Sequence, residues 1–380
     1  MKRVAIIGGG ISGLFIANLF KRNPNYQTTI FEKNSSIRLE EGYGIQLSVN
    51  SIKLLNKIEF NKFQNNEKFT PNKVNFISNK SLKKICELDI ASFNTEDCKY
   101  TTLKRSTLIN FLTKDLEDLI KTNYNISKID QQKNLIQLSF ENNETIEFDY
   151  LIISDGVFSK SKNLISKNLI MPKYNNTLAI RGILPASFKN IDNKNISLFL
   201  GSDFHYVVYP ISSSGDLNFI AIIKYKLPVD DQRNYLLSKD DSFIEKVLKR
   251  ILPKHEKFIN NLKQLKVFPV FVSNNFYKLK SDNIHLIGDA FFAFPPSFAQ
   301  GASQSIEGAY ELFKSIENQS EDDFYKGRVN RTKMINLRSK INQFAFHLSN
   351  PSVTFFRNII LKRLIKNKIF LESYLGKIYR

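Results

Sequence analysis

The sequence of 380 residues lacks tryptophan and has only two cysteines and four histidines. Two thiols in so long a chain imply neither a disulfide framework nor a zinc site, because Cys86 and Cys98 have no metal-like neighbours. The histidines are scattered and show no metal-ligand spacing. No Ser/His/Asp or Cys/His arrangement of a nucleophilic enzyme is visible either. We interpret these residues as isolated structural or surface positions, except for His205, which is considered below.

Long apolar runs are also absent, since no stretch approaches the ~18–20 apolar residues that cross a bilayer. The N-terminus MKRVAIIGGGISG resembles a signal peptide only superficially. Its glycines, and the polar and acidic residues that follow, fit a strand, turn and helix better. The length and the hydrophobic fraction of 42% indicate a large core and two or three domains. We therefore expect a soluble, cytoplasmic protein.

Acidic residues are few, with 36 Asp and Glu against 55 Lys and Arg, which gives a net charge of +19. The lysines are spread along the chain among many Asn and Ile residues, so we expect no nucleic-acid partner. The segment 355–380 is different, because apolar and basic residues alternate there at roughly helical spacing. Peripheral membrane contact is one interpretation. We favour a C-terminal helix that packs its apolar face on the core with its lysines in water.

The first 22 residues have the pattern of a dinucleotide-binding unit. Val4–Ile7 is a short apolar run, readable as a buried parallel strand, and a helical pattern extends from Ile11 to about Arg22. Between them, Gly8 permits a tight turn, Gly10 lets the backbone approach a pyrophosphate, and Gly13 lets the helix pack close to the strand. The free N–H groups at the helix N-terminus would face the phosphates.

A second strand, Thr28–Phe31, ends in Glu32, nineteen residues after Gly13. An acidic residue at this place accepts hydrogen bonds from an adenosine ribose. Its charge would repel the 2′-phosphate of NADP, so the bound adenosine should belong to FAD or NAD. A lone glycine motif is weak, but the strand, glycines, helix and acidic residue together are a strong signal.

Two later apolar strands also end in an acidic residue. Residues 149–156 read DYLIISDG and end in Asp155-Gly156, and the strand 284–287 ends in Gly288-Asp289. Both carboxylates would lie at strand carboxyl ends, where open α/β sheets bind ligands.

Together these segments resemble the single-component flavoprotein aromatic hydroxylases, the para-hydroxybenzoate hydroxylase-like class, and within it the salicylate hydroxylase branch. The resemblance spans nearly the whole chain and is weakest in its middle. Its three signatures are GGGISG (8–13), ISDG (153–156) and LIGDAFFAFPPSFAQGASQSIEGA (286–309), with weaker matches at 42–55, 103–112 and 346–351.

The resemblance implies that FAD is the cofactor. Asp289 would bind ribityl or ribose hydroxyls, and the loop from Pro295 to Gly301 would lie beside the isoalloxazine. A helix from Ala302 to about Ser315 would point its N-terminal dipole at the flavin. The implied cofactor-binding residues are Gly8, Gly10, Ile11, Ser12, Gly13, Glu32, Lys33, Arg105, Asp155, Gly288, Asp289, Gln300, Gly301 and Ala302.

The chain departs from the family pattern at two places. Phe291-Phe292 replaces an Ala-His pair after Gly-Asp-Ala, and Glu307-Gly308-Ala309 stands where Glu-Asp-Ala is usual. Neither change removes a group that holds FAD, but the first could alter the lining of the pocket beside the flavin ring.

The middle of the chain predicts a mainly antiparallel sheet, with strands in 178–186, 196–201, 205–211 and 217–227, joined by a hairpin at 74–90. We therefore expect an α/β protein with a discontinuous Rossmann-like FAD-binding domain, an antiparallel-sheet substrate domain and C-terminal helices. The expected boundaries are 1–73, 91–170 and 271–330 for the FAD domain, 74–90 and 171–270 for the substrate domain, and 331–380 for the helical segment.

The activity implied by the resemblance is that of a monooxygenase. NADH or NADPH reduces FAD, O2 then forms a flavin C4a-hydroperoxide, and this species hydroxylates a small aromatic or electron-rich substrate. Arg181 could hold a carboxylate or phenolate, and His205 could act as a base on a phenol. Tyr206 and Tyr209 are further polar candidates, and Pro295 belongs to the loop beside the flavin.

Other functions are compatible with parts of the pattern. One is hydroxylation of a prenylated quinone precursor at a membrane, and another is a flavin-binding protein without turnover. The absence of tryptophan argues against halogenases of the tryptophan type and against isoprenoid reductases. A pyridine-nucleotide disulfide reductase would need a second glycine motif and a cysteine pair, which the chain lacks.

Overall fold

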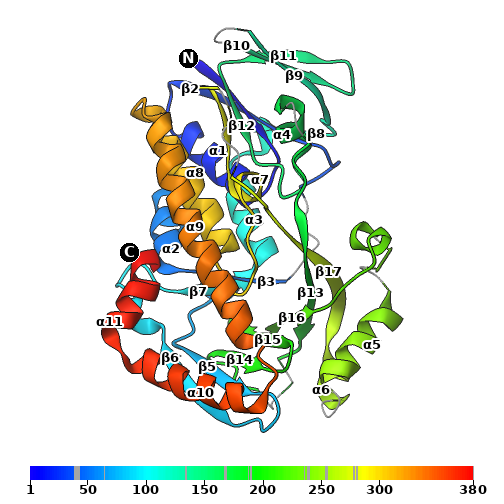
Figure 1. Cartoon of the computed structure of the whole chain (residues 1–380). Helices are drawn as coiled ribbons and strands as arrows, with labels where there is room; N and C mark the ends of the chain where they lie inside the picture. Colours follow the sequence, from blue (N-terminus) through cyan, green and yellow to red (C-terminus); the bar gives the residue numbers. More distant parts are fainter. Residues whose placement is uncertain are drawn as a thin grey trace.

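The computed structural model describes residues 1–37, 43–63, 65–132, 135–166, 169–186, 188, 191–234, 236–237, 240–252, 256–276, 279 and 281–379. Two sheet regions lie at opposite ends of the molecule, and the long helices α8 and α9 run alongside them (Figure 1). The predicted class, a Rossmann-like α/β unit with an antiparallel sheet and C-terminal helices, is confirmed.

A parallel sheet forms the first end, with the strand order β18-β12-β1-β2-β8. Its short apolar strands are buried on both faces, as parallel strands usually are. Ile7 lies opposite both Phe31 and Ile153, and Ile153 lies opposite Leu286, so the carboxyl ends of four neighbouring strands are aligned. The strands are β1 (Lys2–Ile7), β2 (Tyr26–Glu32), β8 (Ile120–Thr122), β12 (Tyr150–Ile153) and β18 (Ile284–Leu286).

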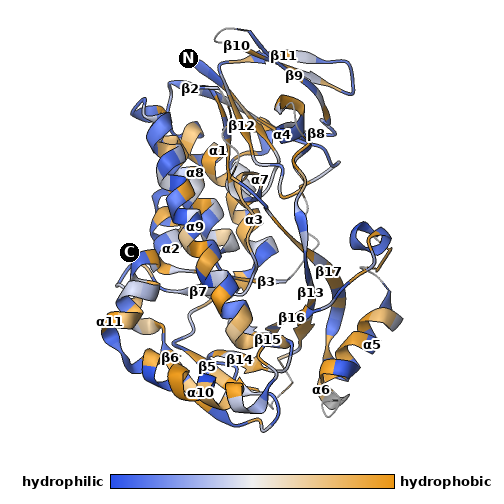
Figure 2. Ribbon diagram, in the orientation of Figure 1, coloured by the Kyte–Doolittle hydropathy of each residue, from blue (hydrophilic) through white to orange (hydrophobic). Residues whose placement is uncertain are grey.

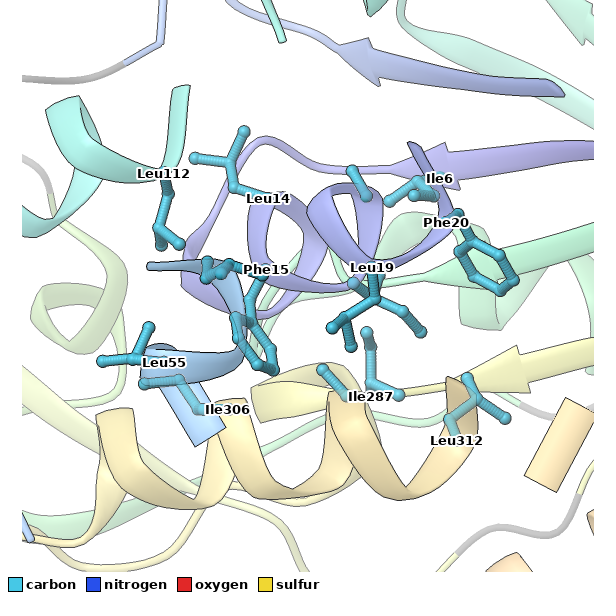
Figure 3. Close-up of a cluster of buried hydrophobic side chains, with 14 of the residues drawn as sticks. Ile6, Leu14, Phe15, Leu19, Phe20, Leu55, Leu112, Ile287, Ile306 and Leu312 are labelled. Carbon is cyan, nitrogen blue, oxygen red and sulfur yellow. The ribbon is translucent and has the colours of Figure 1, made fainter. Parts of the chain in front are cut away.

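Helices cover one face of this sheet. The apolar side chains of α1 pack between the sheet and α8, and Figure 3 shows Leu14, Phe15 and Leu19 in this cluster beside Ile287 and Ile306. Helix α3 completes the layer through residues such as Leu112. The helices of this region are α1 (Ile11–Lys21), α2 (Val49–Leu55), α3 (Arg105–Thr113), α4 (Lys160–Ile165), α7 (Gly288–Phe291) and α8 (Gly301–Glu317).

A three-stranded antiparallel meander packs on the other face of the parallel sheet. Two of its strands are joined by a tight turn at Asn142-Asn143, where Asn143 has a positive φ of 65°. The meander strands are β9 (Ile126–Gln132), β10 (Leu135–Phe140) and β11 (Thr145–Phe148).

A seven-stranded sheet forms the second end, with the order β17-β13-β16-β15-β14-β5-β6. All its pairs are antiparallel except β14 with β5, which brings the early hairpin β5–β6 beside strands of the middle segment. Helices α5 (Asp241–Ile251) and α6 (Glu256–Asn261) cover one face. The strands are β5 (Lys73–Ser78), β6 (Lys84–Asp89), β13 (Lys173–Leu184), β14 (Ile196–Leu200), β15 (Phe204–Pro210), β16 (Leu217–Lys224) and β17 (Lys263–Val272).

A small sheet of three strands lies between the two ends, with β7 paired to both β3 and β4. Gly44 at its edge contacts Asn218 of the large sheet, since Gly44 N donates to Asn218 Oδ1 at 2.6 Å. The strands are β3 (Gly44–Leu47), β4 (Lys68–Phe69) and β7 (Thr101–Lys104). Short helices are η1 (Asn56–Ile58), η2 (Phe60–Lys62), η3 (Asn65–Glu67), η4 (Ala91–Phe93), η5 (Glu117–Leu119) and η6 (Asp230–Arg233).

The C-terminal segment is helical. It comprises α9 (Glu321–Phe346), α10 (Pro351–Lys366), α11 (Lys368–Leu371), the π-helical turn η8 (Glu372–Gly376) and α12 (Lys377–Tyr379). The expectation that its apolar residues would face the core holds for one side of α10 only. Leu361 and Ile365 pack against the β6 region, whereas Phe355 and Phe356 are each 62% exposed. Figure 2 shows hydrophobic and hydrophilic residues interspersed along this helix, which lies on the outside of the molecule.

Candidate cofactor and substrate site

The glycine turn after β1 is closely packed. Gly8 has a φ of 102°, which favours glycine, and its N–H donates to Phe31 O at 2.8 Å. A Cβ at Gly13 would lie 2.2 Å from Gly8 O and 2.5 Å from Ser154 Oγ. Helix α1 can therefore approach the ends of β1 and β12 only because residue 13 has no side chain.

Gly10 has the opposite surroundings, because a Cβ there would meet no atom within 4 Å. It is the N-cap of α1, and it supplies no side chain to bond the first turn, which also contains no acidic residue. The N–H groups around Ile11 and Ser12 therefore present the positive end of an 11-residue helix to open space, which fits a pyrophosphate.

Glu32 ends β2 beside this turn. One of its oxygens accepts from Gly9 N at 3.0 Å, and the other accepts from Asn34 N at 3.0 Å. The carboxylate thus lies one hydrogen bond from the glycine turn, where a ribose next to the pyrophosphate could reach it. Lys33, the next residue, is exposed.

The N-terminal turn and the Gly288-Asp289 segment are in contact. A Cβ at Gly288 would lie 2.5 Å from Ser12 Oγ, and Gly288 has a φ of 59°. The Asp289 side chain is exposed to the open space beside this turn. The protein atoms around its carboxyl still desolvate it, and this raises its pKa to about 6. Two segments some 280 residues apart in sequence therefore form one wall.

Asp155 lies at the end of the neighbouring strand β12. Its Oδ2 accepts from Ser161 N at 3.1 Å, whereas its buried Oδ1 has no hydrogen-bond partner among the described residues. Lys162 is buried close by and donates to Ala290 O at 3.2 Å, which ties the β12 loop to α7. The sequence analysis missed Lys162, because nothing in its neighbourhood marks it as buried.

The loop before α8 completes this wall. Pro295 and Gln300 are buried, and Gln300 is the N-cap of α8 without a side-chain capping bond. Gly301 is exposed, and a Cβ there would meet no atom within 4 Å. Ala302 follows in the first turn and is half-buried. A narrow cavity is lined by residues of both segments, among them Gly288, Asp289, Gly301 and Gln304.

Phe291 and Phe292 line the same narrow cavity as Gly288 and Asp289. They are buried in the core between the meander and α9, where the Phe292 ring stacks on Phe276 with centroids 4.3 Å apart. Both rings therefore contact the core and the cavity, and the expected effect of this pair on the ring side of the pocket stays a prediction.

Arg105 is the first residue of α3, and its N–H donates to Tyr43 O at 2.8 Å. A cavity of about 420 Å³ borders this helix start and is lined by Lys104, Thr107 and the serines 212–214. Its volume lies in the range of small-molecule sites.

A polar group lies on the face of the large sheet opposite to α5 and α6. The Arg181 guanidinium carbon is 5.9 Å from the centroid of the Tyr43 ring. Burial raises the pKa of the Tyr209 hydroxyl, while the charge of Arg181 and hydrogen bonds with Gln46 and Asn218 act in the other direction. Arg181 and Tyr209 are therefore brought together. Asn218, fully buried in an apolar strand, was the overlooked signal for this group.

The structure does not bring His205 and Tyr206 to this group. His205 is about 13 Å from Tyr209 along β15, because a strand rises roughly 3.3 Å per residue. Its Nδ1 lies 2.9 Å from Nε2 of His347, and burial holds its pKa well below the ordinary value. Tyr206 points to the opposite face, where its ring stacks on Phe199 at 4.4 Å.

These observations fit FAD. The glycine turn and the start of α1 suit the pyrophosphate of FAD, and Glu32 suits its ribose. Asp289 and the start of α8 suit the ribityl chain and the ring. Among the described residues no cluster of His, Cys, Asp or Glu could hold a metal. None of the helices in the described ranges combines the length and apolar character that a bilayer crossing requires.

Comparison with known proteins identifies the class. Residues 1–321 match the family model described as FAD binding domain, and the chain belongs to this family of FAD-binding proteins. FAD is therefore its cofactor.

The curated relatives include an epoxidase and a monooxygenase. Spinacia oleracea chloroplastic zeaxanthin epoxidase is 24% identical over 342 residues, which cover 86% of this chain but 49% of the epoxidase. The chain thus spans about half the length of that relative. Bordetella bronchiseptica 6-hydroxynicotinate 3-monooxygenase is 22% identical over 388 residues, which cover 96% of this chain and 98% of the monooxygenase.

The fold also matches solved structures. The crystal structure of Klebsiella pneumoniae HpxO complexed with FAD and uric acid superposes with a TM-score of 0.84 at 16% identity, covering 99% of this chain and 97% of that one.

Proposed function

We propose that this protein is an FAD-dependent monooxygenase that uses NADH or NADPH and O2 to hydroxylate a small aromatic substrate. The contact between Ser12 and Gly288 carries the proposal, because it joins the pyrophosphate turn to the segment that would hold the ribityl chain. The family membership and the match to 6-hydroxynicotinate 3-monooxygenase along nearly the whole of both chains support it.

Bound FAD would supply the redox chemistry, taking hydride from the nicotinamide and activating O2. The protein would hold and orient it. The first turn of α1 would bind the pyrophosphate, Glu32 the ribose, and Asp289 the ribityl hydroxyls. Arg105 would contact the cofactor from α3, and the backbone from Pro295 to Gly301 would face the ring.

The substrate side is proposed from Arg181, Tyr43 and Tyr209. A guanidinium beside two phenol rings favours a flat ring with an anionic edge, since the rings pack on the plane and Arg181 pairs with the charge. Such a ring is consistent with the 6-hydroxynicotinate named for one relative and the uric acid bound to HpxO. The protein would also exclude water around the reacting atoms.

The division of the chain that we propose follows the sheets. The FAD-binding domain would comprise residues 1–73, 91–170 and 271–330. The substrate domain would comprise residues 74–90 and 171–270 and cover the substrate. The C-terminal helical segment, residues 331–380, would pack against these two domains. We place the reaction in the cytoplasm.

The test is to purify the protein with its flavin and to follow NADH and NADPH oxidation with phenols, hydroxypyridine carboxylates and purine-type rings. We expect one group of ring acids to stimulate oxidation, with O2 consumed and product mass increased by one oxygen atom. Bound FAD with no stimulation by any ring would overturn the monooxygenase proposal in favour of a flavin-binding protein without turnover. Turnover restricted to prenylated quinone precursors would overturn the small-substrate proposal.

A further inference from the structure

The outer half of α10 is both apolar and basic. No residue of this 16-residue helix is fully buried. At 100° per residue, its exposed large apolar side chains fall on one half of the helix, together with three cations. We call this half the α10 face; it consists of Val353, Phe355, Phe356, Ile360, Lys362, Arg363 and Lys366.

The other half of α10 already has its packing partner. Leu361 and Ile365 contact the cluster around Phe76 and Ile85, and Arg357 donates to Ala345 O at 3.2 Å. The exposure of the α10 face is therefore not due to a helix that has failed to pack. Phe344, near the end of α9, adds a ring that is 72% exposed just before the turn into α10.

The charge around this face has one sign. Residues 344–371, from the exposed Phe344 to the end of α11, contain five Lys and Arg and no Asp or Glu, while the whole chain carries +19. Burying exposed aromatic rings is favourable, and a contiguous apolar patch rimmed by charge marks an interaction site. The occupant must therefore be apolar where the rings lie and negative where the cations lie.

We propose that the α10 face binds the surface of a membrane that contains anionic lipids. Phenylalanine rings at the level of the acyl boundary, with lysines and arginines at the headgroups, are the composition of an interfacial helix. A second copy of the chain fits less well, because a twofold interface would place the cations of one copy against those of the other.

The experiment uses full-length, FAD-loaded protein and sedimentation with vesicles of phosphatidylcholine, with or without phosphatidylglycerol. We expect binding to the vesicles that contain phosphatidylglycerol, weakened by high salt. Phe355→Ser with Phe356→Ser should weaken binding about ten-fold or more. Replacing Lys362, Arg363 and Lys366 by Gln should weaken it about 100-fold, near a factor of five per charge.

The matched control is the pair Leu169→Ser and Val229→Ser, which removes two apolar side chains that are 75% and 81% exposed elsewhere. It should bind vesicles like the unmodified protein. Flavin content and melting temperature should be unchanged in all variants. The proposal is overturned if the unmodified protein ignores anionic vesicles at low salt, or if the phenylalanine variant binds them equally well. It is also overturned if ultracentrifugation shows a dimer that the phenylalanine variant abolishes.

Discussion

Gly10 and Gly13 lie one helical turn apart, but the space around them differs. A Cβ at Gly10 meets nothing within 4 Å, and one at Gly13 would overlap Gly8 O and Ser154 Oγ. We expect Gly13→Ala to lower the free energy of unfolding by about 1–3 kcal/mol, because α1 must move away from the sheet. Gly10→Ala should change it by less than about 0.5 kcal/mol.

The substitutions at Gly10 and Gly13 should also distinguish an effect on folding from an effect on cofactor binding. The methyl group of Gly10→Ala would occupy the space where the pyrophosphate approaches the backbone, so FAD affinity should fall about ten-fold or more. Urea denaturation of the apoprotein and flavin fluorescence titration measure the two quantities. Unchanged FAD affinity in Gly10→Ala would contradict the assignment of this turn.

At Asp289, one substitution should raise the stability of the apoprotein and lower its affinity for FAD. Its carboxyl has a pKa of about 6 against an ordinary 3.8, so ionisation costs the folded apoprotein stability. We expect Asp289→Asn to raise the melting temperature of the apoprotein at pH 7 and to weaken FAD binding about 10- to 100-fold, since a charged acceptor for hydroxyls is lost.

The sign of the pH dependence follows from the raised pKa. The folded state binds more protons than the unfolded state between pH 3.8 and about 6, so the carboxyl lowers stability progressively across this window. The advantage of Asp289→Asn should therefore grow from pH 4 to pH 6 and stay constant above. Thermal melts of both apoproteins across this range are the measurement. An advantage that shrinks as pH rises would refute the desolvation of this carboxyl.

At the scale of elements, a buried carboxylate joins α8, α9 and α2. Glu307 accepts from Arg328 Nη1 at 3.0 Å, from Arg331 Nε at 2.6 Å and from Asn50 Nδ2 at 2.6 Å. Burial alone would raise the pKa of Glu307, but the hydrogen bonds and charges of Arg331 and Arg328 hold it below the usual value. The Gly308 that follows is needed as well, because a Cβ there would lie 2.9 Å from Arg328 Nε.

We expect Glu307→Gln to destabilise the protein by about 3 kcal/mol at pH 7, because the partly buried Arg331 loses its counter-charge and the buried Arg328 keeps only Glu311. The depressed pKa gives stability that is present above about pH 4.5 and is lost as pH falls below it, so the difference should narrow in acid. Urea denaturation at pH 7 and pH 4 checks both points. Glu317→Gln, at the end of the same helix, is the control; an equal loss there would contradict the network.

The elements that the sequence could predict are those with local signals. The β1–α1–β2 unit, the strands β12 and β18, and the meander have apolar runs, turn residues and glycines within a few positions. The side-chain faces of β15 could not be predicted, because alternation groups His205, Val207 and Tyr209 without saying which face is inward. The His205–His347 contact joins residues 142 positions apart, and no local pattern encodes it.

The candidate site divides in the same way. The predicted cofactor residues lie in short motifs because a dinucleotide is bound by backbone turns and helix dipoles. These turns need glycines and strand ends, which are visible in the sequence. The substrate side uses ordinary polar residues on an apolar sheet, and Tyr43 and Gln46 come from another element altogether. Only packing shows that Tyr43 meets Arg181 and that Gln46 bonds Tyr209.

At the scale of the whole molecule, the C-terminal segment joins the large sheet to the region of the small sheet. Leu375, Ile378 and Tyr379 are buried in a cluster with Tyr100 and Tyr209, and α9 holds the segment by its backbone. Arg338 donates to Tyr374 O at 2.7 Å and to Ser373 O at 2.9 Å. The segment therefore fixes the position of the large sheet relative to the small one.

We expect Arg338→Ala to lower the free energy of unfolding by about 1.5–3 kcal/mol, since two carbonyl oxygens lose a charged donor. Hydrogen exchange should quicken in residues 371–379 more than in β1. Lys340→Ala, an exposed position on the same helix, is the control and should change neither quantity. Uniform exchange across the chain in both variants would contradict a local clamp.

The parallel sheet has a consequence for how the protein is made. Its strand β18 at 284–286 pairs with β12, and only then does Gly288 meet Ser12. A nascent chain on the ribosome therefore has a glycine turn but no complete flavin cradle until the segment around Gly288 has been synthesised. Flavin capture then has to follow the synthesis of this segment, and cells short of riboflavin should accumulate chains that proteases cleave between residues 288 and 301.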